Sequence, residues 1–111
     1  MDKMSLQAKA RELAQKAAQT NSGRAADTVF GGHEKRMRQT VIALRGGAEM
    51  AEHESPGEAT LLVISGRLRL VAGETKWSGR EWDYLVIPNA PHSVEAETDT
   101  TFVLTVAMGD R

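Results

Sequence analysis

Two stretches of the sequence decide the fold: residues 47–66 read GAEMAEHESPGEATLLVISG, and residues 82–92 read WDYLVIPNAPH. Each stretch contains a short apolar run close to glycine or proline, which is typical of a β-strand next to a tight turn. Each stretch also contains one histidine, His53 in the first and His92 in the second. Both stretches therefore predict β-structure that carries an imidazole.

The chain on either side of these stretches continues the pattern of short strands. Runs rich in Val, Ile, Leu and Thr alternate with turns that contain Gly, Pro or Asp. The predicted strands are residues 25–30, 37–44, 59–65, 67–72, 84–87, 92–96 and 101–108, and residues 67–80 fit a hairpin plus a turn. Short strands without intervening helices predict an all-β sandwich or barrel.

The N-terminal segment has a different composition and predicts a helix over residues 5–20. It is rich in Ala, Gln, Lys, Arg and Glu, which favour helices, and Ser5 is placed to cap the first turn. One apolar stripe contains Leu6, Ala10, Leu13 and Ala17. Because so thin a stripe is marginal in water, the helix is expected to dock on the barrel or on a second subunit. Residues 1–23 are thus a helical arm, and residues 24–111 are the barrel domain.

The composition excludes several classes of function. The chain has 111 residues, a formal charge of -1 and scattered charges, so neither nucleic acid nor a membrane surface is expected as a partner. The start of the chain lacks the pattern of a signal peptide, so we expect a cytoplasmic protein. With no cysteine, chemistry must come from His, carboxylate or hydroxyl groups.

The first stretch resembles the first motif of the cupin superfamily. That motif reads glycine, five residues, His-x-His, three or four residues, Glu, six residues, glycine. Gly47, His53 and Gly66 stand at matching intervals. The second histidine of the motif is replaced by Ser55, and its glutamate is replaced by Ala59.

The second stretch resembles the second cupin motif, in which Gly-Asp leads through three residues to Ile-Pro and then to a histidine. Asp83, Pro88 and His92 follow this order, although Trp82 replaces the glycine and the interval from Pro88 to His92 is one residue short. The resemblance covers residues 36–108. It implies an all-β fold, a cupin-type jelly-roll β-barrel with an N-terminal α-helix.

The resemblance also implies a site for a divalent transition metal, because cupins hold Mn, Fe, Ni, Cu or Zn with three histidines and a glutamate. Only His53 and His92 remain here as metal ligands, so a metal would be weakly held. The expected ligand-binding residues are Gln39, His53, Ser55 and His92. The alternative is that both histidines are structural and bond to Ser55, Gln39 or water without any metal.

Two functions remain open at this point. The barrel either binds a small molecule in its interior without catalysis, or it is a metal-dependent dioxygenase or isomerase that uses His53 and His92 as ligands. The loss of two ligand positions favours the binding protein. Family resemblance alone supports the enzyme.

Two further expectations concern assembly and backbone shape. Residues 61–64 are apolar at every position, as are residues 102–104, so these strands need cover on both faces. Because a small barrel has too much surface to provide both covers from its own core, we expect a homodimer. Gly66 lies between two predicted strands and is expected to adopt a positive φ in a tight hairpin.

Overall fold

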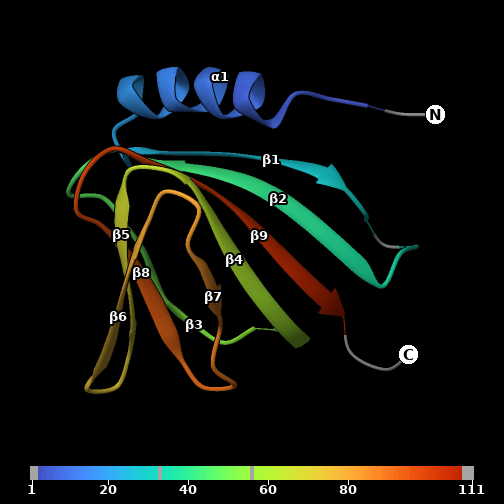
Figure 1. Ribbon diagram of the computed structural model, residues 1–111, viewed down its shortest axis with the longest axis vertical. Helices are drawn as coiled ribbons and strands as arrows, with labels where there is room; N and C mark the ends of the chain where they lie inside the picture. Colours follow the sequence, from blue (N-terminus) through green and yellow to red (C-terminus); the bar gives the residue numbers. More distant parts are fainter. Residues whose placement is uncertain (1–2, 33, 56, 109–111) are drawn as a thin grey trace.

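The computed structural model describes residues 3–32, 34–55 and 57–108. Within these ranges the chain forms one helix and two antiparallel sheets that face each other (Figure 1). The elements are α1 (Leu6–Gln19), β1 (Arg24–Phe30), β2 (Met37–Leu44), β3 (Glu49–His53), β4 (Gly57–Ser65), β5 (Arg67–Ala72), β6 (Thr75–Arg80), β7 (Tyr84–Val86), β8 (His92–Ala96) and β9 (Thr100–Met108). One sheet has the order β1-β2-β9-β4-β7, and the other has the order β3-β8-β5-β6.

The main core lies between the two sheets and is built from alternate residues of their strands. On β4, Leu61 and Val63 point inward and are fully buried. On the opposite sheet, Leu68 and Val94 belong to the same buried cluster. This alternation is the period-two pattern of strands that have one face on the core. The predicted all-β cupin jelly-roll architecture is confirmed.

Helix α1 lies across the outer face of the five-stranded sheet, as Figure 1 shows. Ala10, Leu13 and Ala17 are buried in a second apolar cluster, which the sheet completes from below. The sheet residues of this cluster are Val41, Ala43, Ile64 and Val103. The chain thus covers the outward side of Ile64 with its own helix.

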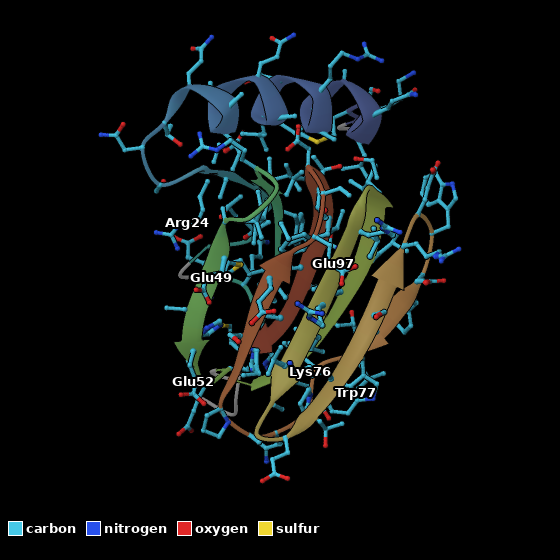
Figure 2. The ribbon with its side chains drawn as sticks, turned by 90° about the vertical axis from the view of Figure 1, so that its left-hand side faces the viewer. Arg24, Glu49, Glu52, Lys76, Trp77 and Glu97 are labelled. Carbon is cyan, nitrogen blue, oxygen red and sulfur yellow. The ribbon has the colours of Figure 1, made fainter. Side chains whose placement is uncertain are left out.

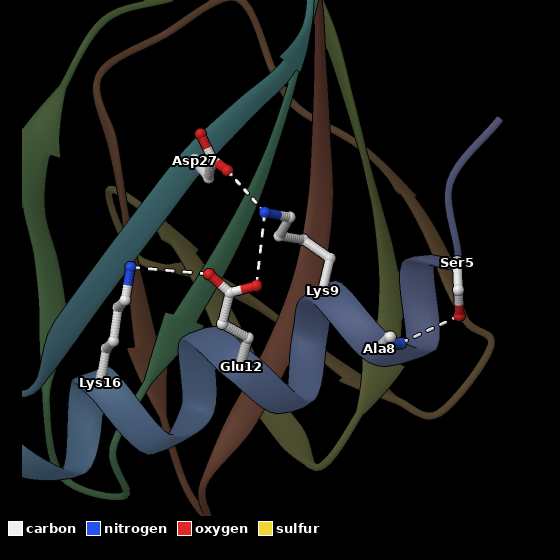
Figure 3. Close-up of polar contacts among 6 residues, drawn as sticks. All are labelled: Ser5, Ala8, Lys9, Glu12, Lys16 and Asp27. Atoms are coloured by element: carbon white, nitrogen blue, oxygen red, sulfur yellow. Dashed lines mark hydrogen bonds and ion pairs between the residues drawn. The ribbon is translucent and has the colours of Figure 1, made fainter. Parts of the chain in front are cut away.

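The start of the helix and its attachment to β1 are both polar (Figure 3). Ser5 caps the helix, because its hydroxyl oxygen accepts a hydrogen bond of 3.1 Å from the Ala8 amide. Lys9 Nζ lies 2.8 Å from Asp27 Oδ2 on β1 and 3.5 Å from Glu12 Oε1. The hydrogen bond from Lys9 lowers the pKa of the Asp27 carboxyl, and the same bond raises the pKa of Lys9.

Two strands, β3 and β6, were not among the seven predicted ones, although the predicted hairpin over residues 67–80 accommodates β6. Both strands lie at the edges of the four-stranded sheet, where most of their side chains are exposed. An edge strand needs no continuous apolar face, so its sequence lacks the expected pattern. The positive φ predicted for Gly66 is confirmed, since it is +82°. The predicted hairpin at Gly66 is wrong, because β4 and β5 lie in different sheets and do not pair with each other. No helix among the described residues has the length and apolarity needed to cross a membrane.

Candidate ligand site at the histidine pair

The two histidines predicted from the motifs lie side by side in the structure. His53 ends β3 and His92 begins β8, and the two residues are direct partners in the antiparallel pairing of these strands. Their ring centroids are 4.7 Å apart, with an angle of 56° between the ring planes. Residues 47–66 and 82–92 therefore bring their imidazoles together, as the motif alignment requires.

The His92 side chain belongs to the inner face of the barrel. It is 2% exposed, and it alternates on β8 with Val94 and Ala96, which both belong to the main core. His53 is exposed. The pair therefore has one ring that faces the barrel interior and one ring that solvent can reach.

Both rings are held by the same local contact. His53 Nδ1 lies 2.9 Å from the carbonyl oxygen of Ala51, and His92 Nδ1 lies 2.9 Å from the carbonyl oxygen of Ala90. A carbonyl oxygen only accepts hydrogen bonds, so each Nδ1 must be the donor and must carry the proton. In a neutral imidazole the other nitrogen, Nε2, then keeps its lone pair. The main chain thus fixes both rings in the tautomer that can accept a proton or bind a metal through Nε2.

The two replaced motif positions add little to this donor set. Ser55 follows β3 and is half-buried, so it offers a neutral hydroxyl. Ala59 is 5% exposed and fills the core with a methyl group where the motif has a carboxylate. Its neighbour Glu58 is exposed and, by strand alternation, points to the opposite face of β4.

The donor set therefore does not fit the full cupin metal cage. No group of three or more His, Cys, Asp or Glu side chains in the described ranges is placed to hold a metal ion. Among the described residues, two imidazoles are what this position offers. Such a site leaves most coordination positions to water or to a bound ligand.

Gln39, predicted as a ligand-binding residue, lies elsewhere. It lies two and four residues before Val41 and Ala43 on β2, so its side chain points the same way as theirs. Those two side chains pack against α1 on the outer face of the sheet. Its side-chain amide donates a 3.1 Å hydrogen bond to Thr105 Oγ1 of the neighbouring strand. The expected hydrogen bond from Gln39 to the histidines is not formed, because a period-two strand places the residue on the other side of the sheet.

The conformation of Trp82, which follows β6, was not predicted from the sequence. Its φ is +70°, and it is the one described residue other than glycine with a positive φ. The turn that contains it is tightly held: the Trp82 amide donates to the Val63 carbonyl at 2.8 Å, and the Asp83 amide donates to the Arg80 carbonyl at 2.8 Å. The signal was present in the motif, since the glycine that Trp82 replaces is the residue that adopts positive φ without strain.

Comparisons with known proteins agree with this fold. No protein-family model matches the sequence, and no curated protein matches it significantly. Among solved structures, the chain is similar to an RmlC-like cupin from Desulfovibrio desulfuricans, at 24% identity over 76% of this chain and 81% of that chain, with a TM-score of 0.67. It is also similar to a cupin superfamily protein from Desulfitobacterium hafniense, at 14% identity over 78% of each chain, with a TM-score of 0.71.

A third similar structure is an enzyme of known reaction. Salicylate 1,2-dioxygenase from Pseudoaminobacter salicylatoxidans, in adducts with gentisate, has a TM-score of 0.78 and 19% identity. The match covers 94% of this chain but 32% of that chain, so this protein corresponds to about a third of the dioxygenase. Identities below a quarter establish the shared architecture and not a shared reaction. With its two facing antiparallel sheets and its paired motif histidines, the chain folds as a small cupin domain.

Proposed function

We propose that this cupin domain binds a small molecule in the barrel interior, next to His53 and His92, and holds a divalent metal weakly if at all. The observation that supports the proposal is the shared tautomer of the two rings, whose Nδ1 atoms are both tied to main-chain carbonyls at 2.9 Å. When both rings are neutral, their Nε2 atoms form a pair of hydrogen-bond acceptors, on rings whose centroids are 4.7 Å apart. Such a pair of acceptors favours a ligand with hydroxyl or carboxylic acid groups, because these groups can donate hydrogen bonds to it.

The rest of the ligand would meet apolar side chains. The interior around β8 is lined by core residues, and Met50, Leu104 and Met108 pack against that core while partly exposed. Methionine side chains are flexible and adapt to irregular ligands. An apolar pocket with a few polar anchors is the usual composition of a small-molecule site.

A metal-dependent enzyme is the second candidate, and the similarity to salicylate 1,2-dioxygenase is the observation that favours it. A metal bound here would be held by His53 and His92 and would supply Lewis-acid chemistry. Ala59 in the glutamate position opposes this reading, since a two-histidine site is expected to lose its metal to a chelator. We therefore place ligand binding ahead of catalysis.

The direct test follows the histidine side-chain NMR signals while gentisate and a set of small hydroxylated acids are added. We expect the signals of His53 and His92 to shift on binding. His53→Ala is expected to weaken binding at least tenfold, because it removes one of the two acceptors. The matched control is Gln39→Ala, which removes a polar side chain on the other face of the same barrel and should leave the affinity unchanged.

Two results would contradict the proposal. One is that no compound of the set perturbs either histidine; the other is equal binding by wild type and His53→Ala. Metal analysis of the protein purified without a histidine tag separates the two candidate functions. Near-stoichiometric transition metal that survives a chelator would favour the enzyme, whereas metal removed by the chelator would favour the binding protein.

A further inference from the structure

A groove on the outer face of the five-stranded sheet is separate from the histidine pair, which belongs to the barrel interior. The groove has a volume of about 470 Å³ and runs along one side of α1. Leu62 and Ile64 of β4 line it on the sheet side, and Leu6 and Ala10 line it on the helix side. The turn between β6 and β7 contributes Trp82 to its rim. An apolar depression of this size is large enough for a small molecule.

The elements that border the groove are held in place by polar contacts. The Trp82 amide donates to the Val63 carbonyl at 2.8 Å, and the Val63 amide donates to the Asp83 carbonyl at 3.0 Å, so the turn is tied to β4. Helix α1 is attached to the sheet by its buried stripe and by the 2.8 Å ion pair of Lys9 with Asp27. The groove is therefore formed before a ligand arrives, which lowers the entropic cost of binding.

The conformation of Trp82 indicates that its side chain has a role at this rim. A bulky residue at a φ of +70° carries backbone strain, which glycine at the same position would relieve. The indole does not offset that strain by filling the core, because it is 66% exposed. Strained residues of this kind cluster at sites that hold ligands, and an indole offers a broad apolar surface to pack on one.

The groove also carries one charge of each sign. Arg11 of α1 and Glu81 of the turn both line it, and both are exposed. Neither side chain forms an ion pair with another described residue. Both side chains are long enough to adjust to a bound molecule. A positive and a negative group are therefore available beside the same apolar surface.

Charged groups on the other sheet are arranged differently. The outer face of the four-stranded sheet is turned toward the viewer in Figure 2. There Arg69 pairs with Glu95 at 3.0 Å and with Glu97 at 3.2 Å. These charges already have partners within the chain, whereas Arg11 and Glu81 leave theirs to a ligand.

We propose that this groove is a second ligand site, which binds an amino acid with an apolar or aromatic side chain. The apolar part of the ligand packs on Leu62 and Ile64 beside the Trp82 indole. Arg11 binds the ligand's carboxylate and Glu81 binds its ammonium group. A zwitterion satisfies both charges, whereas a ligand with a single charge leaves one of the two without a partner. The site lies outside the barrel, so it is independent of the function proposed for the histidine pair.

The experiment follows the side-chain methyl NMR signals of Leu62 and Ile64 while phenylalanine is added to the full chain. We expect these signals to shift and to saturate at about millimolar concentration, as for a ligand of this size in an open site. The signals of His53 and His92 should stay unchanged, which separates this site from the barrel interior.

Two tryptophan variants test the contribution of the indole. Trp82→Gly should weaken the binding of phenylalanine about tenfold or more. Glycine is chosen because it adopts the positive φ without strain, so the variant keeps the turn and a loss of binding cannot be assigned to unfolding. Trp77→Ala is the matched control and should leave the affinity unchanged, since Trp77 is an exposed tryptophan on β6 at the end remote from α1 (Figure 2).

Two analogues of the probe test the roles of the charges. Phenylethylamine lacks the carboxylate and phenylpropionate lacks the ammonium group, so each should bind wild type up to about fivefold more weakly than phenylalanine. Arg11→Ala should abolish the preference for phenylalanine over phenylethylamine and keep its preference over phenylpropionate. Glu81→Gln should have the reverse effect, so each variant is the control for the other.

Four outcomes would overturn the proposal. They are the absence of a saturable shift at Leu62 and Ile64 up to about 10 mM phenylalanine, shifts at the histidine pair in place of the groove, a Trp82→Gly variant that binds as tightly as wild type, and analogues that bind wild type as well as phenylalanine does. A loss of gentisate binding at the histidine pair would leave this site untouched, because the two sites are read out by different signals.

Discussion

Substituting Gly66 by alanine tests how the turn that connects β4 to β5 is locked against the turn before β9. Gly66 has a φ of +82°, and a Cβ added there would overlap the carbonyl oxygen of Asp99. The same Cβ would lie 2.7 Å from Thr100 Oγ1 and 2.8 Å from Thr100 Cα. Alanine therefore faces an unfavourable backbone conformation and a collision with main-chain atoms at the same time.

The expected loss combines two contributions. Holding an alanine in the left-handed region costs about 1–2 kcal/mol. The turn that would have to move is tied to Arg67, whose amide donates to Thr98 Oγ1 at 3.0 Å and whose carbonyl accepts from Thr100 Oγ1 at 2.8 Å. Losing these two hydrogen bonds removes about 1 kcal/mol each. Gly66→Ala should thus lower the free energy of unfolding by about 3–4 kcal/mol.

Urea denaturation measures this loss. With a slope of about 2 kcal/mol per M for a domain of this size, the midpoint should fall by about 1.5–2 M. Gly73→Ala is the matched control, because Gly73 also has a positive φ of +59° but an added Cβ there meets nothing within 4 Å. Its midpoint should fall by no more than about 1 M, which isolates the conformational part of the effect. Equal losses for the two variants would refute the argument from the collision.

Three further changes test how α1 is attached. Leu13→Ala should lower the free energy of unfolding by about 2–4 kcal/mol in urea denaturation, since Leu13 is 2% exposed beneath the helix. Arg45→Ala should reduce it by about 1–2 kcal/mol in the same assay, because the guanidinium donates to main-chain carbonyls at the helix end, that of Thr20 at 2.9 Å among them. Lys9 lowers the pKa of Asp27, so this ion pair stabilises the fold above about pH 4 and is lost as the pH falls below that value. The urea midpoint of Asp27→Asn should therefore be lower than that of wild type at neutral pH, and the difference should shrink as the pH falls below about 4; a difference that is independent of pH would contradict this assignment.

The sequence predicted the parts of the fold where pattern and burial coincide. Strand β2 was predicted with its observed bounds, Met37–Leu44, and its apolar second half is buried on both faces. The helix cap at Ser5 and the positive φ of Gly66 were also predicted correctly, since both follow from local geometry. The edge strand β3 was missed, because an exposed strand such as Glu49–His53 has no apolar periodicity to reveal it.

The candidate site was predictable only in part, for a related reason. Motif spacing identified His53 and His92, which the structure places 4.7 Å apart. Whether Gln39 faces the main core or α1 depends on which residues of β2 point inward. The polar residues around Gln39 fit either face, so the sequence does not decide between them. The hydrogen bonds from each Nδ1 to a carbonyl two residues earlier depend on local backbone geometry that the sequence pattern does not specify.

The five-stranded sheet forms a common wall between two separate apolar clusters, one inside the barrel and one under α1. The cluster under the helix is much the smaller of the two, so lifting α1 from the sheet exposes less apolar surface than unfolding the barrel. The helix should consequently open as a cooperative unit of low stability, and its amides should exchange with solvent deuterium earlier than those of β2 and β9. Each opening would expose Val41 and Val103, and the outer face of the sheet would transiently become an apolar surface prone to association.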